Sequence, residues 1–583
     1  MTFSLFSATV PCMDLLSAFR QALEGAAQTL LLAASTSNQC PRIELIINVS
    51  EKDSSHGDIS STVALQVAKL TKKSPRIVAE ELRTFFATTA QADPILEETL
   101  KTCAIAGPGF LNFTLSQAAW KQFTADLLIN DVDFFKPKNL PSLKILVEFV
   151  SANPTGPLHL AHGRNAIIGD VLCSILSFIG QDVTREFYIN DAGNQVNKLG
   201  ASLKIRYLNA LGIEGEIPEG CYAGLYLKDA AEVLYAEVGD TKKDAPAEFF
   251  CEYAINQMLG LVKQNLDEYG VKFDHFTSEK SVYASGKVAE VVKDLTEKGV
   301  TYEADGALWL KATDFGDDKD RVLRKADGEM TYLAPDTAYY RSNFSQGYDK
   351  LINILGQDHH GYATSRNASL KALGLDTSKL TCLLYQLVLM KKNDVYVRMS
   401  KRAGAFEQLS DVIKTVGRDV TRYFFLNRKA DAHLELDLEQ ALKQNDENPV
   451  YYIHYAFVRT ESLLTKAGES HPEIKAFIQE LSSNTLGCAQ SLTHIPATAA
   501  PLLKKILSLR DLLEIIGSNN QTHMLAYYTY DLASLFHNFY AHTRILVPDD
   551  LNATRDNIVI VFILRRTLRL CLDLLGLSKP KSM

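Results

Sequence analysis

The sequence predicts a multidomain α/β protein built around a doubly wound parallel sheet, and three observations lead to this fold class. A chain of 583 residues is long enough for three or four domains. Strand and helix signals alternate over residues 142–405, which is typical of a Rossmann-type parallel sheet. From about residue 406 the signals are almost entirely helical. We therefore expect an N-terminal α+β domain (1–120), a linker (121–141), the parallel-sheet domain (142–405, with an insertion at about 205–290) and an all-α helical bundle (406–583).

The first 120 residues indicate a small α+β domain. Arg42–Ser50 predicts a strand, Ser60–Leu70 a helix and Phe110–Ser116 a closing strand. Taken alone, this pattern is equally consistent with an interaction or dimerisation module. Phe134–Pro141 (FFKPKNLP) has the composition of a linker.

The segment Leu146–Arg164 (LVEFVSANPTGPLHLAHGR) is the most informative part of the central domain. An apolar run over residues 145–150, interrupted only by Glu148, predicts a strand buried on both faces. A loop rich in Pro and Gly follows, and a helix is expected from about Leu158. Strand, loop and helix in this order direct backbone N–H groups and a helix dipole toward a phosphate.

Two histidines stand at the start of that helix. His159 and His162 are three residues apart, so their side chains point the same way. Two imidazole donors beside a helix N-terminus can stabilise charge that develops on a phosphoryl group. The alternative interpretation is an ordinary surface or capping role.

A second buried strand is predicted at Leu351–Leu355, and the polar run GQDHHG (residues 356–361) follows it directly. In doubly wound sheets, ligands bind beyond the carboxyl ends of the strands. Residues 356–361 are therefore expected to lie at the same site as the two histidines.

The helical third of the chain carries apolar residues at helical spacing, namely Leu502, Ile506, Leu509, Leu513 and Ile516. Ile560–Leu575 is a second long amphipathic segment, and it contains the basic residues Arg565, Arg566 and Arg569. These arginines could form a solvated face or contact nucleic-acid phosphates. Tyr451, Tyr455 and Arg459 are expected on one helix, where they could stack on bases or belong to the core.

Composition narrows the class of protein. The 46% hydrophobic and 22% charged residues are typical of a soluble globular chain. No run approaches the roughly 20 apolar residues that span a bilayer, and the N-terminus has no secretion signal. The nine cysteines are scattered without a CxxC pair, which favours a reducing cytoplasm and no structural metal. A net charge of −8 only slightly lowers the expectation of nucleic-acid binding.

Two motifs together suggest a family. HLAH (residues 159–162) and VRMSKRAG (residues 397–404) resemble the HIGH and KMSKS signatures of class I aminoacyl-tRNA synthetases. The flanking sequences resemble arginyl-tRNA synthetases, in which the landmarks run in the same order. These sequences are HGDISSTVALQVAKL (56–70), AGPGFLNF (106–113), EFVSANPTGPLHLAHGR (148–164), YINDAGNQ (188–195), ADGEMTYLAPDTAYY (326–340), GQDHHGY (356–362), NPVYYIHYAFVR (448–459) and YDLASLFHNFY (530–540).

The resemblance implies a two-step ligase. ATP would activate L-arginine to arginyl-adenylate and pyrophosphate, and the 2′-OH of the terminal adenosine of tRNA(Arg) would then accept the arginine. Mg²⁺ would arrive with ATP, held mostly by phosphates and water. The family is often monomeric, usually needs tRNA even for the first step, and uses its N-terminal domain to contact the tRNA elbow.

The resemblance also assigns residues to each ligand. For catalysis these are His159, His162, Lys401 and Arg398; for arginine, Glu148, Asn153, Tyr332, Asp336 and Gln357; for ATP, Gly156, His159, His162, Asp358, His359, Met399, Ser400 and Lys401; and for tRNA, Tyr451, Tyr455, Arg459 and Met583.

Charge supports the arginine assignment. Glu148 interrupts an apolar strand, and a buried unpaired carboxylate costs several kcal/mol, so it should have a partner. That partner is either an internal Arg or Lys or a cationic ligand. Tyr332 and Asp336 are four residues apart near a helix start marked by Pro335, so they can share a face. Planar carboxylates match a guanidinium bidentately, although a cap and a core aromatic are the alternative interpretation.

The chain departs from the family pattern at three places. Ala161 replaces the usual Gly, where adenine is expected to pack closely. Arg398 replaces the first Lys of KMSKS and changes the donor geometry. His454, Phe457 and Val458 replace the usual Gln, His and Ala, which leaves the details of the tRNA-binding surface open.

Three alternative functions remain from the sequence alone. A nucleotidyltransferase with the same HxxH site is usually much shorter and lacks the helical third. A non-catalytic tRNA-binding paralogue should have lost His159, His162 or Lys401, and all three are present. A synthetase for another amino acid would not need the pair Glu148 and Asp336.

Overall fold

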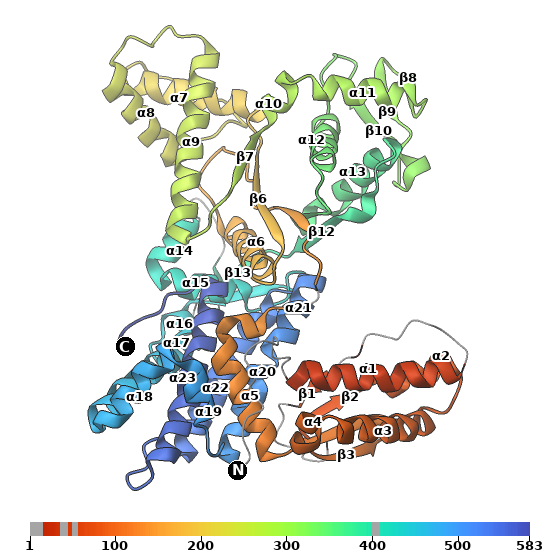
Figure 1. Ribbon diagram of the computed structural model, residues 1–583. Helices are drawn as coiled ribbons and strands as arrows, with labels where there is room; N and C mark the ends of the chain where they lie inside the picture. The colour runs from red at the N-terminus through yellow and green to blue at the C-terminus, as the bar shows by residue number, and fades with distance from the viewer. Residues whose placement is uncertain are drawn as a thin grey trace.

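The computed structural model describes residues 15–34, 43, 45–48, 56–138, 140–392, 395–397 and 408–583. Figure 1 shows a parallel-sheet region in the middle, with the N-terminal domain and the C-terminal helices together at one end. Two further lobes extend from the other end, one containing α7–α9 and one containing α11–α13 with β8–β10. No helix among the described residues is long and apolar enough to cross a membrane.

The N-terminal domain packs helices on a four-stranded antiparallel sheet of order β1-β2-β4-β3. Phe19, Phe86 and Phe113 meet in its core, with ring centroids 5.0–5.8 Å apart. The helix expected from Ser60 begins only at Val63, because Ser60 and Ser61 belong to β2 and pair with β4. The elements are α1 (Leu15–Ala33), β1 (Leu45–Ile47), β2 (Ile59–Ser61), α2 (Val63–Thr71), α3 (Pro75–Ala92), α4 (Pro94–Thr99), β3 (Leu100–Ala106) and β4 (Phe110–Leu115).

Much of the expected linker is helical. α5 (Gln117–Asn130) and the 3₁₀ turn η2 (Asp131–Phe135) cover its first part, and α5 packs on α19 and α23 of the C-terminal region. Two ion pairs join the N-terminal domain to the same region, Arg20 to Asp511 at 2.7 Å and Asp58 to Lys504 at 2.8 Å. The N-terminal domain therefore docks on the C-terminal helices, away from the parallel sheet (Figure 1).

The central sheet has five parallel strands in the order β12-β11-β5-β6-β7. The chain starts at the middle strand and adds strands on both sides, so the order reverses between β5 and β11. Ligands of doubly wound sheets bind beyond the carboxyl ends of the strands at this position. The elements are β5 (Lys144–Glu148), α6 (Leu160–Phe178), β6 (Asp182–Ile189), β7 (His275–Ser278), β11 (Lys350–Gly356), η4 (Gln357–His359), α13 (His360–Ala372), η5 (Thr377–Lys379) and β12 (Leu380–Tyr385).

The insertion between β6 and β7 is a helical module with its own apolar core. It consists of α7 (Asn194–Ala210), α8 (Leu225–Val238) and α9 (Ala247–Tyr269). The part of the predicted insertion beyond residue 274 does not fit this description, because β7 is the fifth strand of the central sheet.

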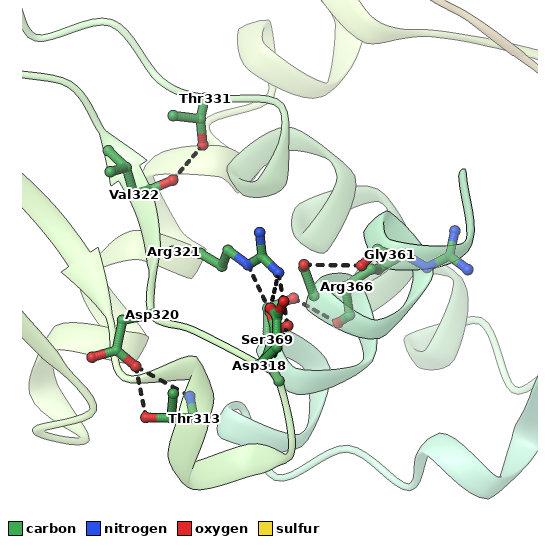
Figure 2. Close-up of polar contacts among 11 residues, drawn as sticks. Thr313, Asp318, Asp320, Arg321, Val322, Thr331, Gly361, Arg366 and Ser369 are labelled. Carbon is green, nitrogen blue, oxygen red and sulfur yellow. Dashed lines mark hydrogen bonds and ion pairs between the residues drawn. The ribbon is translucent and has the colours of Figure 1, made fainter. Parts of the chain in front are cut away.

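A second lobe, not foreseen from the sequence, precedes β11. Its turn η3 packs against α13, and Figure 2 shows polar contacts on each side of this junction, with Arg321 paired to Asp318 in the lobe and Ser369 Oγ donating to Arg366 O within α13. This attachment matters because α13 carries Arg366. The elements are α10 (Glu279–Ala284), α11 (Lys287–Glu297), β8 (Thr301–Ala304), β9 (Ala307–Leu310), η3 (Ala312–Phe315), β10 (Arg321–Arg324) and α12 (Leu333–Ser345).

The C-terminal region is helical, as expected, after a small sheet of order β14-β13-β15 that joins it to the central domain. The apolar series that begins at Leu502 is divided between two helices that meet at Ser508. The first half of α23 is central, since residues 556–564 are all buried, whereas its second half keeps Arg569 and Asp573 exposed on one side of the segment predicted to be amphipathic. The elements are β13 (Val388–Lys392), β14 (Val395–Val397), α14 (Leu409–Val416), α15 (Arg418–Leu426), β15 (Leu434–Asp437), α16 (Leu438–Leu442), α17 (Pro449–Ser470), α18 (Pro472–Ser483), α19 (Thr485–Gln490), η6 (Ala497–Ala499), α20 (Ala500–Leu507), α21 (Leu509–Asn519), α22 (His523–His542) and α23 (Leu551–Leu575).

Candidate active site

The site begins at a strained turn directly after β5. Val150 and Ser151 have φ values of 64° and 38°, a conformation that costs non-glycine residues about 1–3 kcal/mol each. Asn165 on α6 holds the turn, because its Oδ1 accepts a hydrogen bond from Val150 N (2.8 Å) and its Nδ2 donates to Ile354 O on β11 (3.0 Å). One side chain thus joins β5, α6 and β11 at the edge where the strand order reverses.

The two signature histidines meet at the start of α6, which begins at Leu160 and not at Leu158. Their rings stack with centroids 3.7 Å apart, and His162 Nδ1 accepts a hydrogen bond from His159 N (3.4 Å). His162 therefore carries its proton on Nε2. Burial lowers the pKa of His162 to about 3 and also lowers the pKa of His159. Both imidazoles are neutral near pH 7, so each donates a single N–H.

Ala161, which replaces a family glycine, lies between these histidines. It is 7% exposed and its methyl group belongs to the main apolar core. The extra methyl is therefore accommodated on the protein side of the helix.

Glu148 ends β5 in a buried polar network. Its Oε1 accepts a hydrogen bond from Ser151 Oγ (3.0 Å) and its Oε2 accepts one from Tyr340 OH (2.5 Å). Burial is the main cause that raises the pKa of this carboxyl to about 7, and the nearby Asp336 raises it further. The expected partner is therefore present, but it is a phenol and a serine hydroxyl instead of a direct ion pair.

The cation of this network is Arg366 on α13, which is 2% exposed. Its Nη1 donates to Tyr340 OH (3.1 Å) and to Asn353 Oδ1 (2.9 Å). Among the described residues, no ion pair within 4.0 Å joins it to Glu148. The alternative that an internal arginine pairs with Glu148 is thus only partly confirmed, because Arg366 is connected to Glu148 through Tyr340.

Asp336 lies one turn into α12 and keeps an unsatisfied oxygen. Its Oδ2 is shielded from solvent and accepts no hydrogen bond from the described part of the chain. Burial raises the pKa of this carboxyl, while the charge of Arg366 and a hydrogen bond with Tyr362 lower it. A buried acceptor without a donor is what a cationic ligand would satisfy.

Tyr332 precedes α12 and is 63% exposed. It is thus neither a core aromatic nor a side-chain helix cap, which were the alternatives for this pair. Its carbonyl accepts a hydrogen bond from Tyr362 OH (3.3 Å), the same tyrosine that contacts Asp336. Tyr332 and Asp336 therefore lie beside one another, one helical turn apart.

Sequence reasoning missed Glu279, a further buried carboxylate near Asp336. Glu279 is 5% exposed at the start of α10. Burial raises its pKa to about 7, and the charges of Asp191 and Asp336 raise it as well. Asp191 is fixed by hydrogen bonds from Ser278 Oγ (2.6 Å) and Lys280 N (3.0 Å). No short motif contains Glu279, so nothing in the local sequence distinguished it.

The loop between β5 and α6 contacts two neighbouring segments of the chain. Asn153 Oδ1 accepts a hydrogen bond from Asn190 Nδ2 (2.6 Å), a residue of the YINDAGNQ stretch. Tyr226 of the insertion donates to Thr155 O (2.7 Å). Its ring lies so close to Gly156 that an added Cβ would stand 3.0 Å from it. The insertion therefore contacts the loop through one phenol.

Gln357, Asp358 and His359 form η4 directly after β11, as the sequence predicted. All three are exposed, and His359 Nε2 lies 3.7 Å from Asp358 Oδ2. Among the described residues, no group of three or more His, Cys, Asp or Glu is arranged to hold a metal ion. Arg398, Met399, Ser400 and Lys401 of the second signature lie outside the described residues.

The residues assigned to tRNA lie on α17 and at the chain end. Tyr455 is 39% exposed and Tyr451 is partly exposed, so neither is core. The guanidinium of Arg459 lies over the rings of Tyr455 (4.8 Å) and Tyr540 (4.3 Å), and Met583 is 49% exposed.

The arginines of α23 have protein partners. Arg565 pairs with Glu461 (3.2 Å), and Arg566 lies 3.5 Å from Asp131 and donates to Leu128 O. These two side chains are therefore engaged within the protein, and a contact with nucleic-acid phosphates stays a prediction. Arg569 remains exposed.

Comparisons with known families match most of the chain. The model for the catalytic domain of class I tRNA synthetases (R) matches residues 124–444. The arginyl tRNA synthetase N-terminal domain model matches residues 13–115, and the DALR anticodon binding domain model matches residues 453–583. An arginine–tRNA ligase of Geobacter sp. (strain M21) is 40% identical over 532 residues, 91% of this chain and 93% of that one.

The chain belongs to the arginyl-tRNA synthetase family. An arginine–tRNA ligase of Bacillus subtilis (strain 168) is 37% identical over 96% of this chain and 97% of its own. A solved putative arginyl-tRNA synthetase from Campylobacter jejuni matches with a TM-score of 0.73 and 33% identity, over 80% of this chain and 100% of that one. The Thermus thermophilus arginyl-tRNA synthetase (TM-score 0.70, 21% identity, 97% and 100% covered) shows the shared fold.

Membership confirms the family and fold predicted from the motifs. The chain is a class I aminoacyl-tRNA synthetase, an arginine–tRNA ligase, and this class uses ATP. The nucleotidyltransferase alternative does not account for a chain that matches all three arginyl-tRNA synthetase models.

Proposed function

We propose that the carboxylates around Asp336 bind the cationic substrate L-arginine. The unsatisfied Asp336 Oδ2 supports this proposal most strongly. Glu148 and Glu279 add negative charge nearby, while Arg366 is already engaged with Tyr340 and Asn353. A guanidinium offers five donors in a planar fork, which matches carboxylates. A neutral side chain would leave these buried acceptors unpaired, and such a mismatch gives strong discrimination.

Asn153, Tyr332 and Gln357 complete the proposed arginine site. Asn153 and Gln357 follow β5 and β11, the two strands on either side of the point where the strand order reverses. Tyr332 lies beside Asp336. These polar groups hold the amino acid so that its carboxylate faces α6.

The first chemical step needs positioning more than covalent work from the protein. A carboxylate oxygen of arginine attacks the α-phosphorus of ATP, the bond from that phosphorus to the bridging oxygen breaks, and pyrophosphate leaves. His162 and His159 donate N–H groups to the phosphates beside the N-terminus of α6. Gly156, Asp358 and His359 contact ATP, with the last two nearest its ribose.

The second signature supplies further charge to this step. Lys401 and Arg398, with Met399 and Ser400, hold the β- and γ-phosphates. This assignment rests on the motif, since these residues lie outside the described part of the chain. Mg²⁺ accompanies ATP as part of the substrate, bound mainly by phosphate oxygens and water.

The second step transfers arginine to tRNA(Arg). Tyr451, Tyr455, Arg459 and Met583 contact the tRNA, with the aromatic rings and the guanidinium stacking on unpaired bases. The exposure of Tyr455 and Met583 supports this role. We further propose that the enzyme is a cytoplasmic monomer, that tRNA must be bound for activation, and that the domains divide at residues 120, 141 and 405.

ATP–pyrophosphate exchange with each of the twenty amino acids, with and without total tRNA, tests this proposal. We expect exchange with arginine alone and only when tRNA is present. Exchange with arginine in the absence of tRNA would remove the tRNA requirement and keep the pocket. Exchange with another amino acid would overturn the arginine site, and no exchange at all would favour a binding-only paralogue.

A further inference from the structure

A fully buried arginine joins three distant parts of the chain. Arg422 on α15 is 1% exposed. Its Nη2 pairs with Asp170 Oδ2 of α6 (2.5 Å), and its Nη1 donates to Tyr269 O at the end of α9 (3.0 Å). Nε and Nη2 also donate to Leu575 O at the end of α23 (3.1 and 3.0 Å).

The surroundings are built to hold a guanidinium. α9 and α23 both end on α15, and a cation is favourable at the negative end of each helix dipole. Gly576 caps α23 at φ 66°, and a Cβ there would stand 2.0 Å from Arg422 Nη2. A lysine would keep the charge but could not donate in these directions at once.

Asp170 connects this arginine to the signature histidines. Asp170 lies two turns after His162 on α6, and it also pairs with Arg185 of β6. The start of α6 is held by Asn165 and by Arg164, whose guanidinium donates to Gln386 O, Ala432 O and Lys429 O. Buried side chains therefore fix the start and the middle of the helix, and Asp170 in the middle is tied to the C-terminal region through Arg422.

Further contacts connect α15 to α17 and to the chain end, which carry the residues proposed to bind tRNA. On α15, Asp419 Oδ2 accepts a hydrogen bond from Ser578 N (2.9 Å) and lies 3.5 Å from His454 Nε2 of α17. α15 therefore carries contacts to α17, to the chain end and to α6.

We propose that Arg422 is a positioning residue that sets the placement of α6, and hence of His159 and His162, relative to the C-terminal helices. It touches no substrate and acts through Asp170. The inference rests on the proposed role of the two histidines. Displacement of a catalytic group by about 1 Å can cost as much as 10²-fold in rate, so a small shift of α6 is enough to matter.

The test compares Arg422→Lys with Arg510→Lys in the full-length enzyme. Arg510 is also buried (3% exposed) and its Nε donates to Phe134 O (2.6 Å), but it lies on α21, away from the signature histidines. We expect Arg422→Lys to lower kcat for aminoacylation about tenfold per active site, with KM for ATP and for tRNA within twofold of wild type. Arg510→Lys should lower the Tm only.

Normalising kcat to the amount of adenylate-forming sites removes the contribution of unfolded protein. Equal kcat per site in Arg422→Lys and wild type would overturn the proposal, as would a rise in KM for tRNA without a fall in kcat. A wild-type enzyme that does not exchange arginine would instead refute the proposed function.

The variant Asp170→Asn provides a second test, because asparagine keeps the shape of the side chain and one of its two acceptor oxygens. We expect it to lower kcat in the same way, and the double variant Arg422→Lys/Asp170→Asn to be no slower than the slower single variant. Multiplying effects in the double variant would show that the two residues act independently, which contradicts the proposal.

Discussion

The two sides of the site are built in different ways. On the side proposed to bind arginine, Glu148 and Glu279 are 6% and 5% exposed, and Asp336 keeps a shielded oxygen. These groups come from a strand end and from helices α10 and α12, and Glu148 is held by Tyr340, which Arg366 holds in turn. On the proposed ATP side, His159, Asp358 and His359 are exposed on a helix cap and a 3₁₀ turn, and His162 is half-buried.

This difference follows from what each ligand requires. A single side chain must be distinguished from nineteen others, and desolvated charges that are fixed in advance do this best. ATP must enter, react and leave as two products, so its contacts suit an open surface. The predictions below test whether the two sides act separately.

The largest effect is expected from Asp336→Asn. The amide keeps the shape but loses the charge at the unsatisfied Oδ2, and truncating a buried charge partner costs about 2–5 kcal/mol. We expect kcat/KM for arginine to fall about 10³-fold, with KM for ATP almost unchanged. Arginine-dependent pyrophosphate exchange measures both.

Asp294→Asn is the matched control, because Asp294 pairs with Arg341 of the same helix α12 on the exposed side (2.6 Å). It should leave kcat/KM within twofold of wild type. An Asp336→Asn enzyme whose defect lay in KM for ATP would contradict the separation of the two sides.

His162→Ala should have the next largest effect, this time on the ATP side. Removing one preorganised donor to a developing charge costs about 10²- to 10³-fold, and we expect about 10²-fold in kcat for pyrophosphate exchange. KM for arginine should stay within threefold of wild type. A loss seen in KM for arginine instead would place His162 in the amino-acid pocket.

The pH dependence of KM and kcat should again distinguish the proposed arginine side from the proposed ATP side. Burial raises the pKa values of Glu148 and Glu279 to about 7, so the free enzyme takes up protons there as the pH falls below 7. KM for arginine should therefore rise, up to about tenfold per pH unit for each group. His162, with a pKa of about 3, does not titrate in this range, so kcat at saturating arginine should stay flat from pH 6 to 8.

The pH dependence of folding stability should have the opposite sign to that of arginine binding. A carboxyl whose pKa is raised on folding binds its proton more tightly in the folded state, so its contribution to stability falls as the pH rises from about 4.5 to about 7. Arginine should restore that loss and release protons near pH 7, which calorimetry in buffers of different ionisation enthalpy detects. Glu148→Gln should reduce the release, and an unchanged release would exclude Glu148 as its source.

The sequence predicted the local parts of this site better than the tertiary ones. The strand, loop and helix around Glu148 and His159 have strong local patterns, and so does the polar run after β11. Arg366, Tyr340 and Glu279 could not be found in this way, because their roles depend on which segments the fold brings together. Ser508 ends a helix inside an unbroken apolar period, and the four residues of β7 (HFTS) lack the apolar run that marks a buried strand.

The smallest expected effect concerns the loop that serves both sides. Tyr226→Phe removes the hydrogen bond to Thr155 O but keeps the ring against Gly156. The loop carries Asn153, proposed to bind arginine, and Gly156, proposed to contact ATP, so we expect kcat/KM to fall about threefold to fivefold for both substrates. Steady-state exchange kinetics with each substrate varied in turn provide the measurement.

Tyr207→Phe is the matched control for this loop variant. Tyr207 lies in the same insertion, and its OH donates to another backbone carbonyl, Gly239 O (2.5 Å), away from the loop. Each substitution leaves one carbonyl without its donor, which costs about 1–3 kcal/mol where the carbonyl is buried, and Tyr207→Phe also removes the acceptor of Lys242 N (3.4 Å), so its Tm should fall at least as far as that of Tyr226→Phe. Only Tyr226→Phe should change kcat/KM. If it changed the value for one substrate alone, the loop would belong to that side of the site, and the insertion would position a single ligand.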